Sequence, residues 1–319
     1  MKYIKLKGKK IPAIALGTWS WGTGINGGNK VFGNEYTEDD LEPVFKEAMQ
    51  KGFNLWDTAA VYGMGASETI LGKLIEKEKN IIISTKFTPM GIQTKSAMRK
   101  SLNKSLKRLG IKSVDIYWIH NPKNIKKWTR EIIPIVKSSK VKYIGVSNHN
   151  LEEIKEASTI LKKEGLELSA VQNHYSLLYR ESEEAGIIDW CHNNDVAFFS
   201  YMILEQGALS GKYNVNNPFI SGTRRGKAFN SEVLGKIGNL IEAMGKIGTK
   251  YQVEPAVIAI AWALSKGTVP VIGVTKRTHI DGAISALDIK LEESDITVLE
   301  KEAKDTGVLV KASWEKSMI

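Results

Sequence analysis

The stretch Leu55-Trp56-Asp57-Thr58-Ala59-Ala60-Val61-Tyr62-Gly63 contains the pattern on which the whole chain is built. Its apolar start, together with residues 52–54, predicts a short buried strand that ends at Asp57, and Tyr62 follows in a loop. A segment with apolar residues at helical spacing comes next, over residues 67–77. The stretch therefore predicts one unit made of a strand, a polar strand end and a helix.

This unit is repeated along the chain. Strands are predicted at 13–17, 52–56, 81–86, 114–120, 143–148, 170–174, 196–201 and 268–272. Helices are predicted from residue 37, at 67–77, 94–109, 128–136, 151–163, 181–193, 232–251, 255–265 and 278–287, and from residue 292. Uninterrupted alternation implies a parallel sheet, and eight units are the number that closes into a barrel. The sequence predicts an α/β fold, a (β/α)8 TIM barrel.

Two further features complete this prediction. Residues 3–14 read as a hairpin that covers the bottom of the barrel, and extra helices lie near the carboxyl terminus, before a polar tail. We interpret residues 1–319 as a single domain. An open nucleotide-binding sheet would carry a G-x-G-x-x-G turn after its first strand, and Gly17-Thr18-Trp19-Ser20-Trp21-Gly22 does not match it.

Composition narrows the functional classes. The 319 residues are 42% hydrophobic and 25% charged, which suits a large globular core. Cys191 is the only cysteine, which rules out an intramolecular disulfide and fits a cytoplasmic protein. The amino terminus lacks the apolar region of a signal peptide, and no apolar run is long enough to cross a membrane. The net charge of +10 comes from lysines scattered over helices, which favours a solvated surface over a nucleic-acid site.

Polar residues end most of the predicted strands. They are Asp57, Tyr62, Lys86, His120, Ser147, Asn148, Gln172 and Tyr201. Each one alone could be a turn former, a snorkelling lysine or a packed core residue. Because all strands of such a barrel end at one rim, and because burying Asp, Lys and His without partners is costly, we interpret the set as one site.

The chemistry of this set indicates proton transfer beside a bound cofactor. A neighbouring ammonium, Lys86, is expected to lower the pKa of Tyr62, and Asp57 would keep that ammonium charged. His120 would donate a hydrogen bond to the same substrate oxygen. Ser147, Asn148 and Gln172 offer partners for a flat carboxamide, and Tyr201 offers a ring for stacking, which together suit a nicotinamide.

At this point the chain resembles the aldo-keto reductases over nearly its whole length. The matching motifs are Gly17-Thr18-Trp19, Trp56-Asp57-Thr58-Ala59, Tyr62-Gly63, Ser67-Glu68, Ser84-Thr85-Lys86, Ile119-His120, Ile144-Gly145-Val146-Ser147-Asn148, Gln172-Asn173-His174-Tyr175 and Gln206-Gly207-Ala208-Leu209-Ser210-Gly211-Lys212-Tyr213. The resemblance implies NADPH as cofactor and hydride transfer from nicotinamide C4 to an aldehyde or ketone. It also implies that Asp57, Tyr62, Lys86 and His120 form a catalytic tetrad, without a metal.

The resemblance extends to the rest of the cofactor. Besides Ser147, Asn148, Gln172 and Tyr201, the expected cofactor contacts are Gly17, Thr18, Trp19, Leu204, Gln206, Gly207, Leu209, Gly211, Lys212, Gly273, Thr275, Lys276 and Arg277. Two departures stand out. Met202-Ile203 replaces the common Ser-Pro before the pyrophosphate loop, and Gly282-Ala283 stands where a Glu-Asn pair often holds adenine. Lys276 and Arg277 begin a predicted helix, which favours the extra phosphate of NADPH over NADH.

The substrate is less defined than the cofactor. Trp21, Trp118 and Trp128, with Trp19, are candidates for an aromatic pocket wall, although tryptophans in a barrel of this size also serve as packing. No basic clamp indicates a phosphorylated sugar, so we expect a small carbonyl compound. The alternative is a cofactor-sensing regulatory subunit, because the potassium-channel beta subunits resemble the same family. The oligomeric state is not predicted.

Overall fold

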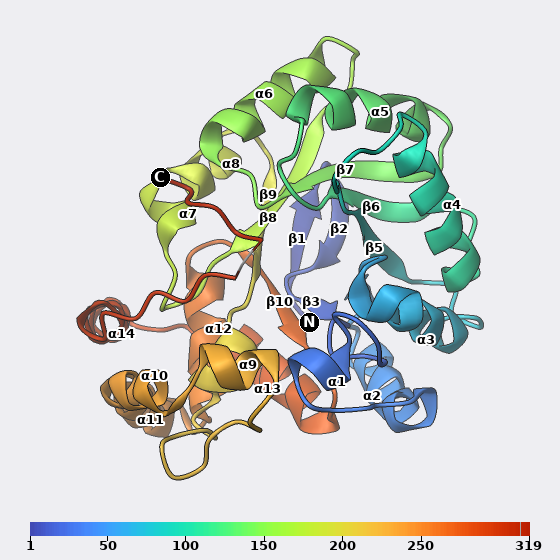
Figure 1. Cartoon of the computed structure of the whole chain (residues 1–319). Coiled ribbons are helices and arrows are strands. Elements are labelled where there is room, and N and C mark those ends of the chain that lie inside the picture. The colour runs from blue at the N-terminus through green and yellow to red at the C-terminus, as the bar shows by residue number, and fades with distance from the viewer. Residues whose placement is uncertain (313) are drawn as a thin grey trace.

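The computed structural model describes residues 1–312 and 314–319 and contains a closed barrel of parallel strands (Figure 1). The strands are β3 (Ala15–Gly17), β4 (Leu55–Asp57), β5 (Ile82–Phe87), β6 (Val114–Ile119), β7 (Val141–Ser147), β8 (Leu168–His174), β9 (Ala197–Tyr201) and β10 (Val269–Gly273). They pair in sequence order, and β10 closes the barrel by pairing with both β3 and β9. The predicted (β/α)8 barrel is confirmed.

Helices surround the barrel. Those that follow barrel strands are α2 (Glu38–Gln50), α3 (Ala66–Leu74), α4 (Ala97–Leu109), α5 (Ile125–Lys137), α6 (Leu151–Lys162), α8 (Ile187–Asn193), α12 (Pro255–Ser265) and α13 (Arg277–Asp288). Shorter or additional helices are α1 (Gly28–Val31), α7 (Glu181–Glu184), α9 (Arg224–Ala228), α10 (Ser231–Lys236), α11 (Gly238–Tyr251) and α14 (Glu293–Asp305). Two 3-10 turns, η1 (Tyr62–Gly65) and η2 (Glu205–Ser210), lie at strand ends.

The amino-terminal hairpin closes the barrel interior, as predicted. Strands β1 (Tyr3–Leu6) and β2 (Lys9–Pro12) pair antiparallel. Leu6 and Ile11 are buried and belong to the same apolar cluster as Leu55 and Ile82, which are the first residues of β4 and β5. The hairpin therefore plugs the end where the strands begin and leaves the opposite rim for polar chemistry.

Local sequence rules explain several helix boundaries. Asp40 accepts a hydrogen bond from the backbone amide of Thr37 at 2.8 Å, so the predicted capping box starts α2. Gly110 ends α4 in the left-handed conformation that glycine tolerates, with φ of 67°. The helix predicted at 181–193 is broken into α7 and α8 by Gly186, with φ of 69°. The helix predicted at 232–251 is likewise two helices.

The described part of the carboxyl-terminal tail, residues 306–312 and 314–319, differs from the simple polar tail that the sequence suggested. Figure 1 shows it in red, running from α14 back toward α7 and α8. Met318 is buried in the main core, and Lys316 forms an ion pair with Glu153 of α6. Since Glu153 belongs to the capping box that starts α6, the tail returns to the rim of the barrel. Among the described residues, no helix is long and apolar enough to span a membrane.

Candidate active site

The polar residues that end the barrel strands meet at one rim. Asp57 is the last residue of β4, Lys86 lies near the end of β5, and His120 directly follows β6. The strand register brings Asp57 opposite Ser84, and Ser147 opposite Gln172. Because parallel strands end on the same side, side chains far apart in the chain form one cluster.

A buried ion pair lies at the base of this cluster. The Nζ atom of Lys86 donates to Asp57 Oδ2 and to the carbonyl oxygen of Thr58, the latter at 2.8 Å. The side chain of Lys86 is 0% exposed and that of Asp57 is 4% exposed. Burial acts to lower the pKa of Lys86, but the charges and hydrogen bonds of Asp57 and Tyr62 together outweigh it, so the pKa is raised and the lysine stays an ammonium.

The second carboxylate oxygen of Asp57 is also held. It accepts hydrogen bonds from Ser84 Oγ at 2.6 Å and from Gln172 Nε2 at 3.2 Å. A buried carboxylate with three donors around it is fixed in position and charge. Gln172, expected to contact a carboxamide, thus has at least one amide hydrogen committed to Asp57.

Tyr62 stands above the ion pair on η1. This turn runs through Gly63, Met64 and Gly65 with φ of 57°, 56° and 99°, and a Cβ on Gly63 would lie 2.7 Å from the carbonyl oxygen of Thr23. Only a glycine fits there, and the sharp turn aims the phenol at the rim. Lys86 Nζ lies 5.1 Å from the centre of the Tyr62 ring.

The pKa of Tyr62 departs from the sequence expectation. Burial raises it, and the positive charge of Lys86 opposes this effect without reversing it, so the net pKa is raised rather than lowered. The reason is that burial is the larger influence on the pKa of the phenol, and the negative charge of Asp57 adds to it. Tyr62 is therefore a fully protonated phenol at neutral pH.

His120 faces the same space as Tyr62. Their rings are 6.2 Å apart at 76°. Burial and then the charge of Lys86 lower the pKa of His120, so the imidazole is neutral. Its Nδ1 lies 2.9 Å from the hydroxyl oxygen of Thr88. If that hydroxyl donates, the ring hydrogen is on Nε2, which leaves a neutral donor for a substrate oxygen.

The residues expected around a nicotinamide also converge. Ser147 and Asn148 are buried, and Asn148 Nδ2 donates to the carbonyl oxygen of His120 at 2.9 Å. The Tyr201 hydroxyl oxygen lies 2.6 Å from Asn148 Oδ1. Thr18 differs from these residues, because its hydroxyl is hydrogen-bonded to the carbonyl oxygen of Asp57 and to the hydroxyl of Ser67. These bonds connect the ends of β3 and β4.

The predicted pyrophosphate loop is a tight turn. Glu205, Gln206 and Gly207 have φ of 46°, 56° and 104°, and Gly211 has φ of 77°. The replacement at Met202 is accommodated by a left-handed backbone, with φ of 62°. Leu209 is buried, while Leu204 and Gly211 are partly exposed and Lys212 is exposed.

Buried polar atoms near this turn lack partners among the described residues. They include Gln206 Oε1 and Arg225 Nε, and Arg225 reaches the carbonyl oxygen of Gln206 through Nη1 at 3.4 Å. Unsatisfied buried donors and acceptors are costly, so a water molecule or a polar ligand is expected to bind to them. A left-handed turn with such atoms beside it fits the phosphates of a dinucleotide.

The part of the expected cofactor site at the end of β10 and the start of α13 carries basic side chains. Gly273 ends β10, Lys276 is the N-cap of α13, and Arg277 is its first residue. Lys276 and Lys212 both act electrostatically on His279, whose Nδ1 accepts from the backbone of Thr275 at 3.2 Å. Positive side chains at a helix start suit a phosphate group.

Comparison with known proteins agrees with this geometry. The sequence model of the Aldo/keto reductase family matches residues 13–303 of the chain. The chain belongs to this family. Aldo/keto reductases use nicotinamide cofactors, so this protein is an oxidoreductase that acts on carbonyl compounds in the general sense of the family.

Individual relatives have low sequence identity to this aldo/keto reductase, but the alignments cover nearly its whole chain. The chain is 32% identical to a probable aldo-keto reductase 1 of Glycine max over 308 residues, which cover 90% of this chain and 87% of that protein. It is 29% identical to an NADP(+) aldo-keto reductase of Schizosaccharomyces pombe, with 97% and 93% covered. The structure of a glycerol dehydrogenase from Gluconobacter oxydans superposes with a TM-score of 0.83 at 22% identity, covering 98% and 99%, which shows the shared fold.

Three tryptophans of this aldo/keto reductase are placed differently from the expected pocket wall. Trp21 and Trp118 are 0% exposed and Trp128 is 3% exposed. Trp21 donates to the carbonyl oxygen of Val274, Trp118 fills the barrel interior, and Trp128 packs on Phe87. Their indoles are core packing and present no open face to a substrate.

Trp19 does lie at the mouth. Its ring stacks on Tyr62, with centres 5.9 Å apart, and meets Trp314 of the tail edge-on at 5.8 Å. Trp314 was missed by sequence reasoning, as were Glu315, His174 and Glu205, which form a buried charged group beside Tyr201. The signal available was the presence of one tryptophan and one glutamate in an otherwise basic tail.

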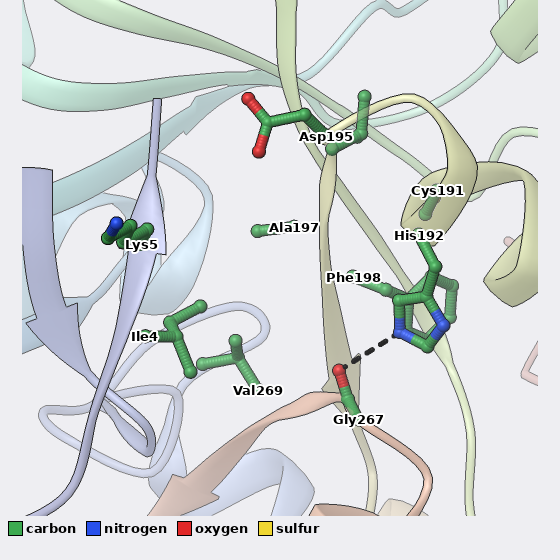
Figure 2. A pocket seen from close by; sticks show the side chains of 10 residues that line it. Ile4, Lys5, Cys191, His192, Asp195, Ala197, Phe198, Gly267 and Val269 are labelled. Atoms are coloured by element: carbon green, nitrogen blue, oxygen red, sulfur yellow. Dashed lines mark hydrogen bonds between the residues drawn. The ribbon is translucent and has the colours of Figure 1, made fainter. Parts of the chain in front are cut away.

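A separate cavity lies at the other end of the barrel (Figure 2). It has a volume of about 190 Å³ and is lined by residues of β1, α8, β9, β10 and the loops before β9 and β10, including Lys5, Cys191 and Asp195. His192 of its wall contacts the carbonyl oxygen of Gly267 at 3.3 Å. This cavity contains none of the strand-end residues. No group of three or more metal-binding side chains occurs among the described residues.

Proposed function

We propose that this aldo/keto reductase reduces small aldehydes or ketones with NADPH, and that Tyr62 donates the proton. The observation that carries the proposal is the buried Lys86–Asp57 ion pair directly beneath the Tyr62 ring, with a neutral His120 beside it. Such a pair costs desolvation energy, and the charge of Lys86 offsets part of the effect of burial on the phenol, which favours the phenolate left after proton transfer.

Each residue has a distinct role in this proposal. Bound NADPH supplies the hydride for the carbonyl carbon. The Tyr62 hydroxyl gives its proton to the carbonyl oxygen, and Lys86 stabilises the phenolate that remains. Asp57 holds Lys86 charged and does not itself transfer a proton. The Nε2–H of His120 donates to the same oxygen and thereby orients the carbonyl group.

The cofactor would lie across the rim. Ser147, Asn148 and Tyr201 would hold the nicotinamide end, the turn around Gly207 the phosphates, and Lys212, Lys276 and Arg277 the 2′-phosphate. The orphaned buried atoms of Gln206 and Arg225 support this position. The basic end supports NADPH over NADH, and adenine would be held without a Glu-Asn pair.

The substrate would enter beside Trp19. The stacked Trp19 and Tyr62 rings and the edge-on Trp314 ring form an aromatic surface next to the proton donor. Such a surface suits aryl or short alkyl carbonyl compounds, which gain from apolar contact. The reverse reaction, oxidation of the alcohol, uses the same residues in the opposite order.

Tyr62→Phe tests the mechanism. The wild type is expected to consume NADPH when mixed with activated aromatic aldehydes such as nitrobenzaldehyde, and the variant is expected to lose at least about 100-fold in kcat while still binding NADPH. Tyr3→Phe is a matched control, because Tyr3 lies on β1 and is 53% exposed. Turnover that survives Tyr62→Phe would refute Tyr62 as the donor. A wild type without turnover on any carbonyl compound would refute the proposed function.

For the cofactor preference, Lys276→Ala is the direct test. The variant is expected to bind NADPH about 10-fold more weakly while its affinity for NADH is unchanged, because one charged contact to the extra phosphate is lost. Lys100→Ala, an exposed change on α4, is the control. An unchanged ratio of the two affinities would remove Lys276 from the site.

A further inference from the structure

The hydroxyl of Tyr201 has two acceptors and one proton. Its oxygen lies 2.6 Å from Glu315 Oε1 and 2.6 Å from Asn148 Oδ1. The orientation of the Asn148 amide is set by its Nδ2, which donates to the carbonyl oxygen of His120. A phenol can donate to only one of two acceptors. The acceptor that does not receive this proton keeps both of its lone pairs for another donor at the rim of the barrel.

Glu315 is the preferred acceptor of the Tyr201 proton. Its carboxylate is fully buried, and Oε2 accepts from the backbone amide of Ala312 at 2.8 Å. His174 Nδ1 lies 3.2 Å from the same oxygen. On its other side, His174 Nε2 lies 2.7 Å from Glu205 Oε1. An imidazolium between two buried carboxylates donates to both of them.

The charges of this group are consistent with that arrangement. Burial acts to lower the pKa of His174, but Glu205 and then Glu315 outweigh it and raise the pKa to about 10. Burial acts to raise the pKa of Glu315, and the hydrogen bond and charge of His174 outweigh it, so the pKa is lowered. Glu315 is therefore an ionised acceptor at neutral pH, and a hydrogen bond to a charged acceptor is stronger than one to an amide oxygen.

The tail that carries Glu315 is held in place by the residues that directly follow it. Lys316 pairs with Glu153, and the backbone amide of Met318 donates to Glu181 Oε2 at 2.8 Å. Met318 itself is buried. The carboxylate is thus delivered to the rim by a folded segment, and the site beside Tyr201 is incomplete without the tail.

We propose that Glu315 is a positioning residue for the cofactor: it takes the phenol proton of Tyr201 and so leaves Asn148 Oδ1 free to accept a hydrogen bond from a primary carboxamide. The carboxamide is that of the nicotinamide, so the inference rests on the proposed function. Without an ionised Glu315 the phenol donates to Asn148 Oδ1 and occupies one of its two lone pairs, so this oxygen becomes a weaker acceptor for the carboxamide.

A double-mutant cycle on NADPH affinity tests this role without measuring turnover. The dissociation constant of NADPH is measured by calorimetry for the wild type, Glu315→Gln, Tyr201→Phe and the double variant. Glu315→Gln is expected to weaken binding about 10-fold, the loss of one good hydrogen bond. In the Tyr201→Phe background the same change is expected to have less than about a 2-fold effect, since no phenol remains to compete.

Two controls separate this role from a loss of structure. Glu293→Gln changes an exposed glutamate of α14 and is expected to leave NADPH affinity unchanged. Tryptic cleavage after Lys311, followed by mass spectrometry, reports whether the tail stays docked. An unchanged affinity in Glu315→Gln would overturn the proposal. An equal loss in both backgrounds together with faster cleavage would also overturn it, because tail docking would then be the whole effect.

The same experiment distinguishes this inference from the proposed function. A wild type that binds and oxidises NADPH, with Glu315→Gln behaving identically, refutes only the role of Glu315. A wild type that does not bind NADPH refutes the proposed function and the role of Glu315 with it.

Discussion

The Nε1 atom of Trp118 donates to Ser84 Oγ, and that hydroxyl donates in turn to Asp57 Oδ1. The indole fills the barrel interior, 5.3 Å from the Phe199 ring, and stands beneath the ion pair. A residue expected at a substrate wall thus supports the charged base of the site. The hydrogen-bonded chain links the packing of the barrel interior to the orientation of the Asp57 carboxylate.

Gly145→Ala should disturb this support. A Cβ on Gly145 would lie 2.1 Å from Trp118 Cε3, a distance that the ring must relieve by moving. We expect a loss of about 1–3 kcal/mol in the free energy of unfolding and a lower kcat, because an overpacked interior is strained. Urea unfolding and steady-state kinetics measure both quantities.

Gly282→Ala is the matched control for that substitution. Gly282 lies within α13, and its nearest neighbour, Val257 Cγ2, would be 3.5 Å from the new Cβ. The change is expected to be neutral or to stabilise by up to about 1 kcal/mol, since alanine favours helices. Equal stability of the two variants would contradict the close packing of Trp118 on Gly145.

Asp57→Asn should affect both stability and turnover. The Lys86 ammonium is fully buried, and without the carboxylate it would be an unpaired charge in the barrel. Breaking one partner of such a pair costs about 3–5 kcal/mol. Equilibrium unfolding and kcat are to be compared with Asp288→Asn, an exposed change at the end of α13. A variant as stable and active as that control would show that the ion pair has no role.

The rim residues were predictable because their positions follow from the strand pattern. An apolar run that ends in a polar residue places that residue at the rim, and Asp57, Lys86 and His120 are there. The side of the strand on which the Trp118 side chain lies was not predictable. Strand β6 is almost continuously apolar, so it lacks the polar alternation that would separate inward from outward positions.

Neither the role of the tail nor the pKa of Tyr62 followed from the sequence. Glu315 is separated from Tyr201 by 114 residues and lies outside any periodic element, so no local rule brings the two together. The expected lowering of the Tyr62 pKa considered only its charged neighbours. Burial is the larger influence, and it depends on packing that a single strand end does not reveal.

The pH dependence of turnover should reflect two neutral groups. The pKa of His120 is lowered by burial and by Lys86, so the imidazole does not gain a proton near neutrality. The pKa of Tyr62 is raised, so the phenol keeps its proton until the pH exceeds about 10. We expect kcat/KM for carbonyl reduction to be flat between about pH 6 and about pH 9 and to fall only at higher pH. A loss of rate centred near about pH 6.5 would show instead that His120 titrates normally.

The last prediction concerns the buried His174. Its pKa is raised to about 10 by Glu205 and Glu315, which outweigh burial, whereas an unfolded histidine titrates near about 6.5. A group whose pKa is higher in the folded state stabilises the fold fully below the unfolded pKa, and this contribution disappears as the pH rises through the folded pKa. The pKa of Glu315 is lowered, so this group titrates only at acidic pH. The pKa values of the neighbouring Tyr179 and Tyr201 are raised, so both phenols stay protonated between about pH 6.5 and about pH 10.

The free energy of unfolding should therefore decline between about pH 6.5 and about pH 10 in the wild type, and this decline should be smaller in His174→Gln. Urea unfolding across that range measures both slopes, and tryptic cleavage after Lys311 reports on tail docking at the same pH values. His192→Gln is the control, since His192 is largely exposed on α8. If wild type and His174→Gln lose stability in parallel, His174 is not held as an imidazolium between the two carboxylates.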